Sequence, residues 1–336
     1  MNIKIVKRAT FICAAIIGVV IFIKMNDGLN SFFQRVKSED AVMTFMTVNR
    51  SDEEKLALRA LIEEEAKQRS EKAINAYIDP VFHAIPGYNG LEVDVEATYA
   101  YNVNLARGEK LHFIYQEVQP TVHLDDLGLQ PIFKGNPNKK MVAYMVNVAW
   151  GNDELVKVLD ILKKENVKLT FFLDGSWLKK NMELAKRIQD EGHELSNHAY
   201  SHPDMSKLSR QKQMEQIAKT NDLLTQLNVK TEWFAPPSGD FNQTTVEVAK
   251  ELGMHTVLWT LDTVDWRNPP AYQVINKISK KLEPGSLVLM HPTQTTVDSL
   301  AELIRVAKEK GLEVGTVTET LSPERQRKVV VSPLLF

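Results

Sequence analysis

The pattern of apolar residues divides the chain into three regions: an apolar N-terminal segment, a region of mixed pattern, and a region in which apolar stretches alternate regularly with amphipathic ones. From about residue 140, seven short apolar stretches alternate with stretches that have the 3.6-residue period of an amphipathic helix. This alternation predicts a parallel sheet covered by helices, and a closed or nearly closed barrel fits it better than an open sheet. The predicted strands are 141–146, 168–173, 193–196, 231–234, 255–259, 286–290 and 313–317.

The region before the alternation, residues 40–135, is predicted to be a small α+β module. Ser51 and Glu54 have the spacing of a capping box, and the stretch that follows predicts one long helix to about residue 78. Alternating apolar and polar residues over 91–99, and again over 110–118, predict two strands. Because the module has no cluster of catalytic residue types, its expected role is a spacer or a contact domain.

Residues 1–24 are predicted to direct export. Lysines and an arginine precede an apolar run over 9–23, which is the order of a signal peptide or a signal anchor. As a helix the run would be about 22 Å long, which is short for a bilayer, so its length leaves both alternatives open. Since no small-x-small cleavage pattern occurs near residues 20–28, an uncleaved anchor on the outer face of the bacterial cytoplasmic membrane is the favoured interpretation.

The amino-acid composition limits which functions and which kinds of metal site are expected. The 336 residues carry 41 Lys plus Arg and 43 Asp plus Glu, and their formal net charge is -2. Without a basic block, nucleic acid is not an expected partner. A single cysteine, Cys13, excludes an internal disulfide framework and a Cys-rich zinc site. Any metal would therefore be bound by histidines and carboxylates.

Polar and aromatic residues follow the carboxyl ends of five predicted strands, the edge of a (β/α) barrel where functional sites lie. His198 and His202 are four residues apart, a spacing that predicts two imidazoles on one face of a helical turn and suits a divalent metal. Considered alone, the pair could merely stabilise a loop or be exposed, and His291 could be a buried core histidine. Their convergence at one edge favours a site. The clusters are Asn147, His198 with His202, 235–239, Asp262 with Asp265 and Trp266, and His291.

These residues resemble the motifs of polysaccharide deacetylases of the NodB homology type, carbohydrate esterases with a deformed (β/α)7 barrel. The resemblance covers about residues 140–320, which sets the predicted catalytic domain. The apolar start and the module are similar to those of sporulation-associated members. The most specific pieces are Thr170-Phe171-Phe172, Glu191-Gly192-His193-Glu194, 197–204, Pro236-Pro237-Ser238-Gly239, 262–266 and Leu289-Met290-His291.

The resemblance implies metal-dependent hydrolysis of N-acetyl groups on a cell-wall glycan such as peptidoglycan or a chitin-like polymer. In the family a divalent metal, usually zinc, is held by an Asp and two His and binds the attacking water, whose proton a second Asp accepts. By this resemblance, His198 and His202 would be the metal ligands. His291 would be the proton donor, and Asp265 would orient it. The N–H of Ser238, next to Pro237, would stabilise the oxyanion, and Trp266 with Leu289 would form the acetyl slot.

The first strand departs from the family pattern. Where the family has Thr-Phe-Asp-Asp-Gly, residues 145–149 read Met-Val-Asn-Val-Ala, so Asn147 replaces the base and Val148 replaces the metal carboxylate. An amide does not accept the proton of water at neutral pH, and two histidines are one ligand short of a usual catalytic zinc site. Ala235 replaces the arginine that steadies the base. The sequence therefore predicts weak or absent catalysis and weak or absent metal binding.

Three functions remain open. The favoured one is a surface-anchored protein with the deacetylase fold that binds glycan without running the family reaction. The second is an active, divergent amide hydrolase whose metal takes a third ligand from Asp153, Asp174 or Asp204. The third is a scaffold that works through residues 40–135.

Overall fold

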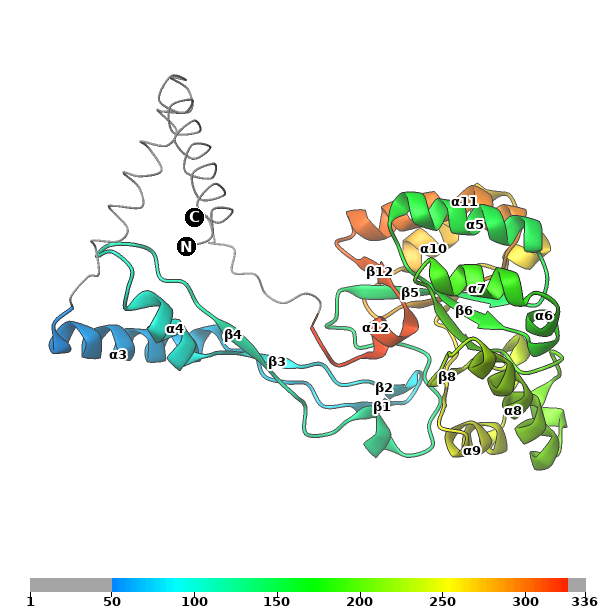
Figure 1. Ribbon diagram of the computed structural model, residues 1–336, viewed down its shortest axis with the longest axis horizontal. Coiled ribbons are helices and arrows are strands. Elements are labelled where there is room, and N and C mark those ends of the chain that lie inside the picture. Colours follow the sequence, from blue (N-terminus) through cyan, green and yellow to red (C-terminus); the bar gives the residue numbers. More distant parts are fainter. Residues whose placement is uncertain (1–49, 326–336) are drawn as a thin grey trace, which may run out of the picture. The chain divides into compact units, whose positions relative to one another are not determined.

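The computed structural model describes residues 50–325 (Figure 1). The predicted export segment, residues 1–24, lies outside the described residues. Within residues 50–325, no helix is both long enough and apolar enough to cross a membrane. The described residues form two compact units, one of residues 50–69 and 93–115 and one of residues 70–92 and 116–325. The domain limits at 40–135 and 140–320 stay predictions.

The smaller unit contains helices α3 (Asp52–Arg69) and α4 (Val95–Asn102). The predicted capping box is present, because the Ser51 N–H donates to Glu54 at 2.7 Å and the Glu54 N–H donates to Ser51 Oγ at 3.2 Å. The prediction that this helix continues to residue 78 is wrong. Beyond α3, the Glu71 and Ile74 backbone groups form antiparallel bridges instead, so they are not available to a helix.

The strand predicted over 91–99 is also wrong in its second half. Only β3 (Gly90–Val93) is extended, and α4 follows it. Asp94 ends the strand because its side chain accepts the Ala97 N–H at 2.9 Å and caps α4. The strand predicted over 110–118 is shortened to β4 (Tyr115–Val118), which pairs with β3. Further elements absent from the prediction for this region are β1 (Tyr77–Asp79), β2 (His83–Ile85) and the 3-10 turn η1 (Leu124–Leu127).

The larger unit is built on one curled parallel sheet in the order β10-β11-β5-β6-β7-β8-β9, with β12 paired to the start of β5. Each of the seven predicted strands is present, and the short β10 is an addition. The ladder is open between β9 and β10, so the sheet is a curled half-barrel rather than a closed barrel. The strands are β5 (Met141–Val148), β6 (Thr170–Leu173), β7 (Glu194–Asn197), β8 (Trp233–Phe234), β9 (His255–Thr256), β10 (Leu261–Asp262), β11 (Leu287–Met290) and β12 (Glu313–Gly315).

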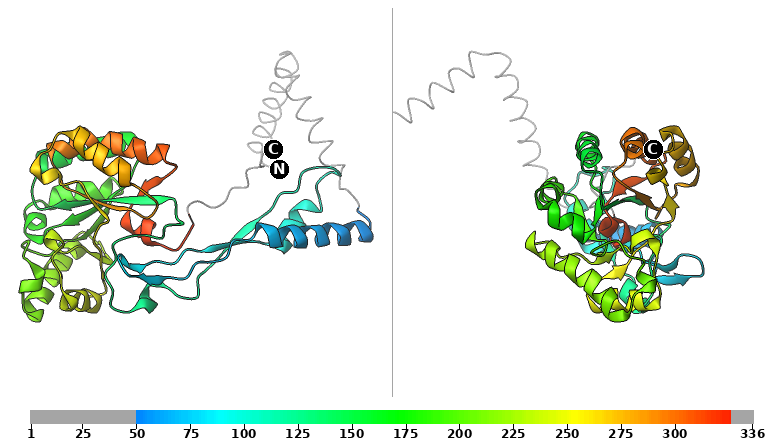
Figure 2. Two further views of the ribbon diagram at one scale, coloured as in Figure 1. Left: turned by 180° about the vertical axis from the view of Figure 1, so that it is seen from behind. Right: turned by 90° about the vertical axis from the view of Figure 1, so that its right-hand side faces the viewer.

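Helices cover the outside of this sheet, as Figures 1 and 2 show from different sides. All eight residues of β5 are buried, because the strand lies in the middle of the sheet and is covered on both faces. The helices are α5 (Asn152–Glu165), α6 (Gly175–Lys180), α7 (Met182–Asp190), α8 (Arg210–Gln226), α9 (Gln243–Glu251), α10 (Ala271–Lys281), α11 (Gln294–Glu309) and α12 (Val317–Leu321), with 3-10 turns η2 (Met205–Lys207), η3 (Pro237–Gly239) and η4 (Asp265–Arg267).

The main core lies between the sheet and the α5, α10 and α11 helices, which pack together along one side of the unit (Figure 1). Leu155, Leu159 and Leu162 of α5 are fully buried there, as their helical spacing predicts. A smaller cluster with Met145 and Phe172 fills the other side of the sheet. This packing fixes the strands, and the strands in turn place the loops at their carboxyl ends.

Candidate functional site

A cavity of about 480 Å³ lies at the carboxyl ends of the strands in the larger unit. It brings together residues from six separate segments of the chain, and seven of the predicted site residues are among them. Pro237 and Asp265 do not line it. The lining residues are Asn147, Ala149, Trp150, His198, His202, Ser238, Trp259, Asp262, Trp266, Leu289 and His291.

The end of β5 supplies an amide and an aliphatic side chain to this region. Val148 is fully buried in the ladder, where it is paired with Leu173 of β6, and its carbonyl accepts the Asp174 N–H at 2.9 Å. Asn147 lines the cavity, and its Oδ1 atom is buried without a hydrogen-bond partner among the described residues. A buried acceptor left unpaired is costly in free energy, so this oxygen is a natural contact for a ligand.

The two predicted metal histidines lie together, but not on a helical turn as their spacing predicts. Residues 198–202 form a loop in which Ala199 and His202 have left-handed backbone angles, with φ of 57° and 54°. Gln216 of α8 holds the loop by accepting the Tyr200 N–H at 3.0 Å and the Ser201 N–H at 2.9 Å. The ring centres of His198 and His202 are 5.3 Å apart and the rings are inclined by 72°.

His198 is held in one orientation by the neighbouring strand end. Its Nδ1 lies 2.7 Å from the carbonyl oxygen of Ala235. Because a carbonyl only accepts, Nδ1 carries the proton and Nε2 has the free lone pair. Burial, together with the charge of nearby His202, lowers the pKa of His198 to about 3. The neutral imidazole therefore offers one metal-binding or hydrogen-accepting nitrogen.

A third protein ligand does not join this pair. Among the described residues, no group of three His, Cys, Asp or Glu side chains is placed to hold a metal ion. Asp174 instead caps α6 by accepting the Trp177 N–H at 2.9 Å, and Asp204 pairs with Lys207 at 2.6 Å. Asp153 is exposed in the first turn of α5. The donor set therefore does not fit the three-ligand zinc site of the family.

The acid half of the predicted site is fully assembled. The buried Asp265 accepts the His291 backbone N–H at 2.6 Å, and its other oxygen lies 2.8 Å from His291 Nδ1. Thr296 also donates to this carboxylate. Burial raises the pKa of Asp265, but the hydrogen bonds and charge of His291 and the bond from Thr296 outweigh that effect and leave the pKa below its usual value. The arrangement orients His291 with Nε2 free of the carboxylate.

Three tryptophans border the cavity, and the sequence pointed to only one of them. Trp150 is half exposed and stacks on His291 at a centroid distance of 6.2 Å and an interplanar angle of 5°. Trp259 lies close against Gly239, where an added Cβ would come within 2.9 Å of the indole. Gly239 also has a φ of +66°, which favours glycine. The signal that could have indicated these two residues is their position near predicted strand ends: Trp150 follows the strand predicted over 141–146, and Trp259 is the last residue of the strand predicted over 255–259.

The remaining predicted residues are on the η3 turn and on β11. Ser238 has a φ of 56° and lines the cavity, whereas Pro237 is buried beside it in the turn. Leu289 of β11 also lines the cavity. Ala235 is fully buried and gives its carbonyl to His198. The roles of Ser238 as an oxyanion donor and of Trp266 with Leu289 as an acetyl slot stay predictions.

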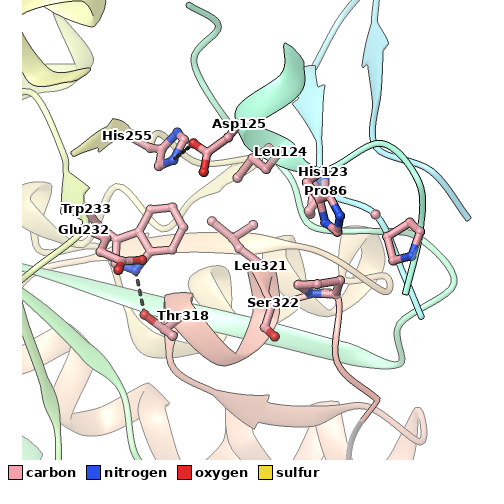
Figure 3. A pocket seen from close by; sticks show the side chains of 13 residues that line it. Pro86, His123, Leu124, Asp125, Glu232, Trp233, His255, Thr318, Leu321 and Ser322 are labelled. Atoms are coloured by element: carbon pink, nitrogen blue, oxygen red, sulfur yellow. Dashed lines mark hydrogen bonds and ion pairs between the residues drawn. The ribbon is translucent and has the colours of Figure 1, made fainter. Parts of the chain in front are cut away.

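A second cavity, of about 310 Å³, lies at the opposite ends of the strands (Figure 3). Trp233 and His255, which begin β8 and β9, form part of its wall, and the Trp233 indole donates to Thr318 Oγ1 at 2.6 Å. His255 Nε2 lies 3.1 Å from Asp125, which also pairs with Lys250. Asp125 and His255 are thus already paired within the protein, so we take the larger cavity as the better candidate site.

Comparisons with known proteins match this fold. A family model described as polysaccharide deacetylase matches residues 134–257. The chain is 32% identical to a peptidoglycan-N-acetylglucosamine deacetylase of Bacillus cereus, over 71% of this chain and 94% of that protein. A crystal structure of a CE4 family pseudoenzyme from Bacillus anthracis matches with a TM-score of 0.73 and 44% identity, covering 80% of this chain and 96% of that one. A mutant of that pseudoenzyme, described as having restored enzymatic activity, matches with a TM-score of 0.73 and 43% identity over 80% and 99% of the two chains.

Proposed function

This chain belongs to the polysaccharide deacetylase family, and from that premise we propose that it binds cell-wall glycan without carrying out the family's hydrolysis. The Bacillus cereus relative is named for its action on peptidoglycan and the Bacillus anthracis relative is named a pseudoenzyme. We propose that this chain binds the same kind of glycan as the Bacillus cereus relative and, like the Bacillus anthracis relative, lacks the family's activity.

The end of β5 is the observation that carries the proposal. In the family, this point of the barrel provides one carboxylate to the metal and another to the attacking water. Here it provides the buried Val148 and the neutral Asn147. Ala235, which stands where the family has an arginine, agrees with these replacements. An arginine buried next to the amide of Asn147 would be an unpaired charge.

The features that remain are suited to holding a sugar. Trp150, Trp259 and Trp266 present indoles to the cavity, and such rings bury large areas while keeping a polar edge. His291 is oriented by Asp265, and Asn147 offers an unpaired acceptor. When a metal is bound in the family, it supplies Lewis-acid activation of water. Among the described residues, His198 and His202 are the two that would hold such a metal, and no third ligand joins them, so binding is the activity that the residues support.

We also propose that the protein acts on the outer side of the bacterial cytoplasmic membrane, attached through residues 1–24. The order of charged and apolar residues in that segment supports this location. An outward-facing protein would have direct access to peptidoglycan, which is the glycan that the proposal requires.

Restoring the two carboxylates tests the proposal. The double variant Asn147→Asp with Val148→Asp should bind zinc and release acetate from peptidoglycan or from N-acetylglucosamine oligomers, at least about 100-fold faster than the parent chain. Each single variant should release acetate far more slowly than the double variant. Val148→Asp alone lacks the general base, and Asn147→Asp alone lacks the third metal ligand. A matched control adds His198→Ala to the double variant and should abolish the gain. A parent chain that already releases acetate as fast as the double variant would contradict the proposal.

A further inference from the structure

The charge of the cavity distinguishes between glycans. No lysine or arginine is among the described residues that line it, and Asp262 is the only acidic residue that does. Arg267 lies over the Trp266 ring at 4.7 Å but is not part of the lining. The buried Asp265 lies behind His291 and is paired with its imidazole, so the negative charge of the lining comes from Asp262. A cationic ligand group is therefore electrostatically complementary to this site.

The hydrogen-bonding groups of the cavity favour a ligand that donates hydrogen bonds. Asn147 presents an Oδ1 atom that is buried and has no partner among the described residues. Asp262 uses Oδ1 to accept the Val264 N–H at 2.8 Å, which leaves Oδ2 for a ligand. An ammonium group carries three N–H donors and no acceptor, so it matches a lining that offers acceptor oxygens. An acetamido group carries one N–H donor and brings a carbonyl oxygen that itself needs a donor.

The aromatic lining adds to the same preference. Trp150, Trp259 and Trp266 come from three different loops and all border the cavity. An indole face attracts a cation through its quadrupole, and a carboxylate beside several such rings is an arrangement that binds ammonium groups. The same rings stack on the apolar face of a sugar, so they hold the ring whether or not its nitrogen is acetylated.

We propose that this cavity binds the ammonium group of a de-N-acetylated amino sugar in preference to the N-acetylated sugar. The inference rests on the proposed function, namely that the cavity holds a glycan. It adds which glycan is held: the protein recognises amino-sugar polymers whose acetyl groups have already been removed. The reaction that supplies this ligand is then an amide hydrolysis carried out by another protein.

Binding of two matched oligomers to the full chain tests this inference. The probes are the hexamer of β-1,4-linked glucosamine and the hexamer of β-1,4-linked N-acetylglucosamine, titrated at a pH at which the free amine is protonated. Isothermal titration calorimetry should give a Kd about tenfold lower for the amine-bearing hexamer. Equal affinity, or tighter binding of the acetylated hexamer, overturns the inference and leaves the proposed function standing. Binding of neither hexamer overturns both.

Two charge-neutralising variants locate the effect. Asp262→Asn keeps an oxygen that can accept the Val264 N–H, so the loop is retained, and it should remove the preference while sugar binding persists. The matched control is Glu232→Gln, which neutralises a carboxylate that lines the second cavity (Figure 3). It should leave the tenfold preference unchanged. If Glu232→Gln removes the preference and Asp262→Asn does not, the amine binds in the second cavity and the inference is wrong.

Discussion

Asp265 binds His291 through both of its oxygens, one accepting the backbone N–H at 2.6 Å and the other lying 2.8 Å from Nδ1. The carboxylate is completely buried, so its charge is balanced only by these groups and by threonine hydroxyls. We expect Asp265→Asn to lower the free energy of unfolding by about 3 kcal/mol, because an amide N–H₂ would face existing donors. Chemical denaturation measures this loss.

The matched control for that change is Asp160→Asn. Asp160 pairs with Arg187 at 2.8 Å, but its side chain is 65% exposed, so its loss should cost less than about 0.5 kcal/mol. A loss below about 1 kcal/mol for Asp265→Asn would mean that the pair contributes little to the fold.

His193 should make stability depend on pH. Burial lowers its pKa to about 4, helped by the charge of Lys168, and its Nδ1 accepts the Leu169 N–H at 3.2 Å. In the unfolded chain the pKa returns to about 6.5. The unfolded state therefore binds more protons between these values, and the stabilisation present above about pH 6.5 is lost as the pH falls toward about 4.

The variant His193→Gln isolates this effect, because glutamine does not titrate while the other buried histidines remain. Between about pH 7 and about pH 5, the parent chain should lose about 1 kcal/mol more unfolding free energy than the variant, a value reduced for solvent screening. Denaturation curves at both pH values give the comparison. Identical losses in the two proteins would exclude His193 as a source of the pH dependence.

Val264 is held in a left-handed conformation, with φ of 56° and ψ of 30°, which is unfavourable for a β-branched residue. Its N–H bond to Asp262 keeps the loop that places Asp265 and Trp266. Val264→Asn should raise the unfolding free energy by about 0.5 kcal/mol, because asparagine tolerates this region. The reciprocal change at Asn268, which has a φ of 51°, should lower it by about 1 kcal/mol for Asn268→Val. If thermal unfolding shows both changes to be neutral, the conformation is not a source of strain.

Trp150 should contribute to ligand binding more than to stability. It is 48% exposed, and its indole lies parallel to the His291 ring. Trp150→Ala should weaken glycan binding by about tenfold, while the melting temperature changes by only about 2 °C. Tyr77→Ala, at an exposed position of β1 outside the cavity, is the control and should leave binding unchanged. Equal affinity of the Trp150 variant and the parent would place the sugar elsewhere.

The sequence predicted the sheet well because each strand is bounded by clear signals. The seven apolar stretches between helical periods are all strands, since fully buried parallel strands leave an unbroken apolar pattern. The alternation over 91–99 misled because one residue, Asp94, caps a helix in the middle of it. Local capping therefore overrode a pattern with the period of a strand.

The site was predictable where it depends on strand ends and not where it depends on loop conformation. Asn147 lies near the carboxyl end of β5, whereas His198 and His291 directly follow β7 and β11, and the structure brings all three to one cavity. Trp259 reaches it because Gly239 permits close approach, and this pairing is not visible in sequence spacing. The geometry of His198 and His202 likewise depends on two left-handed residues in the loop, which the four-residue spacing did not reveal.

Metal content of the parent chain tests the central claim most directly. The protein should be purified without chelator, analysed for zinc, cobalt and nickel, and then incubated with N-acetylglucosamine oligomers to measure released acetate. With two histidines and no carboxylate at the end of β5, we expect well under one equivalent of metal and no acetate above background. Close to one equivalent of tightly bound metal together with acetate release would contradict the account.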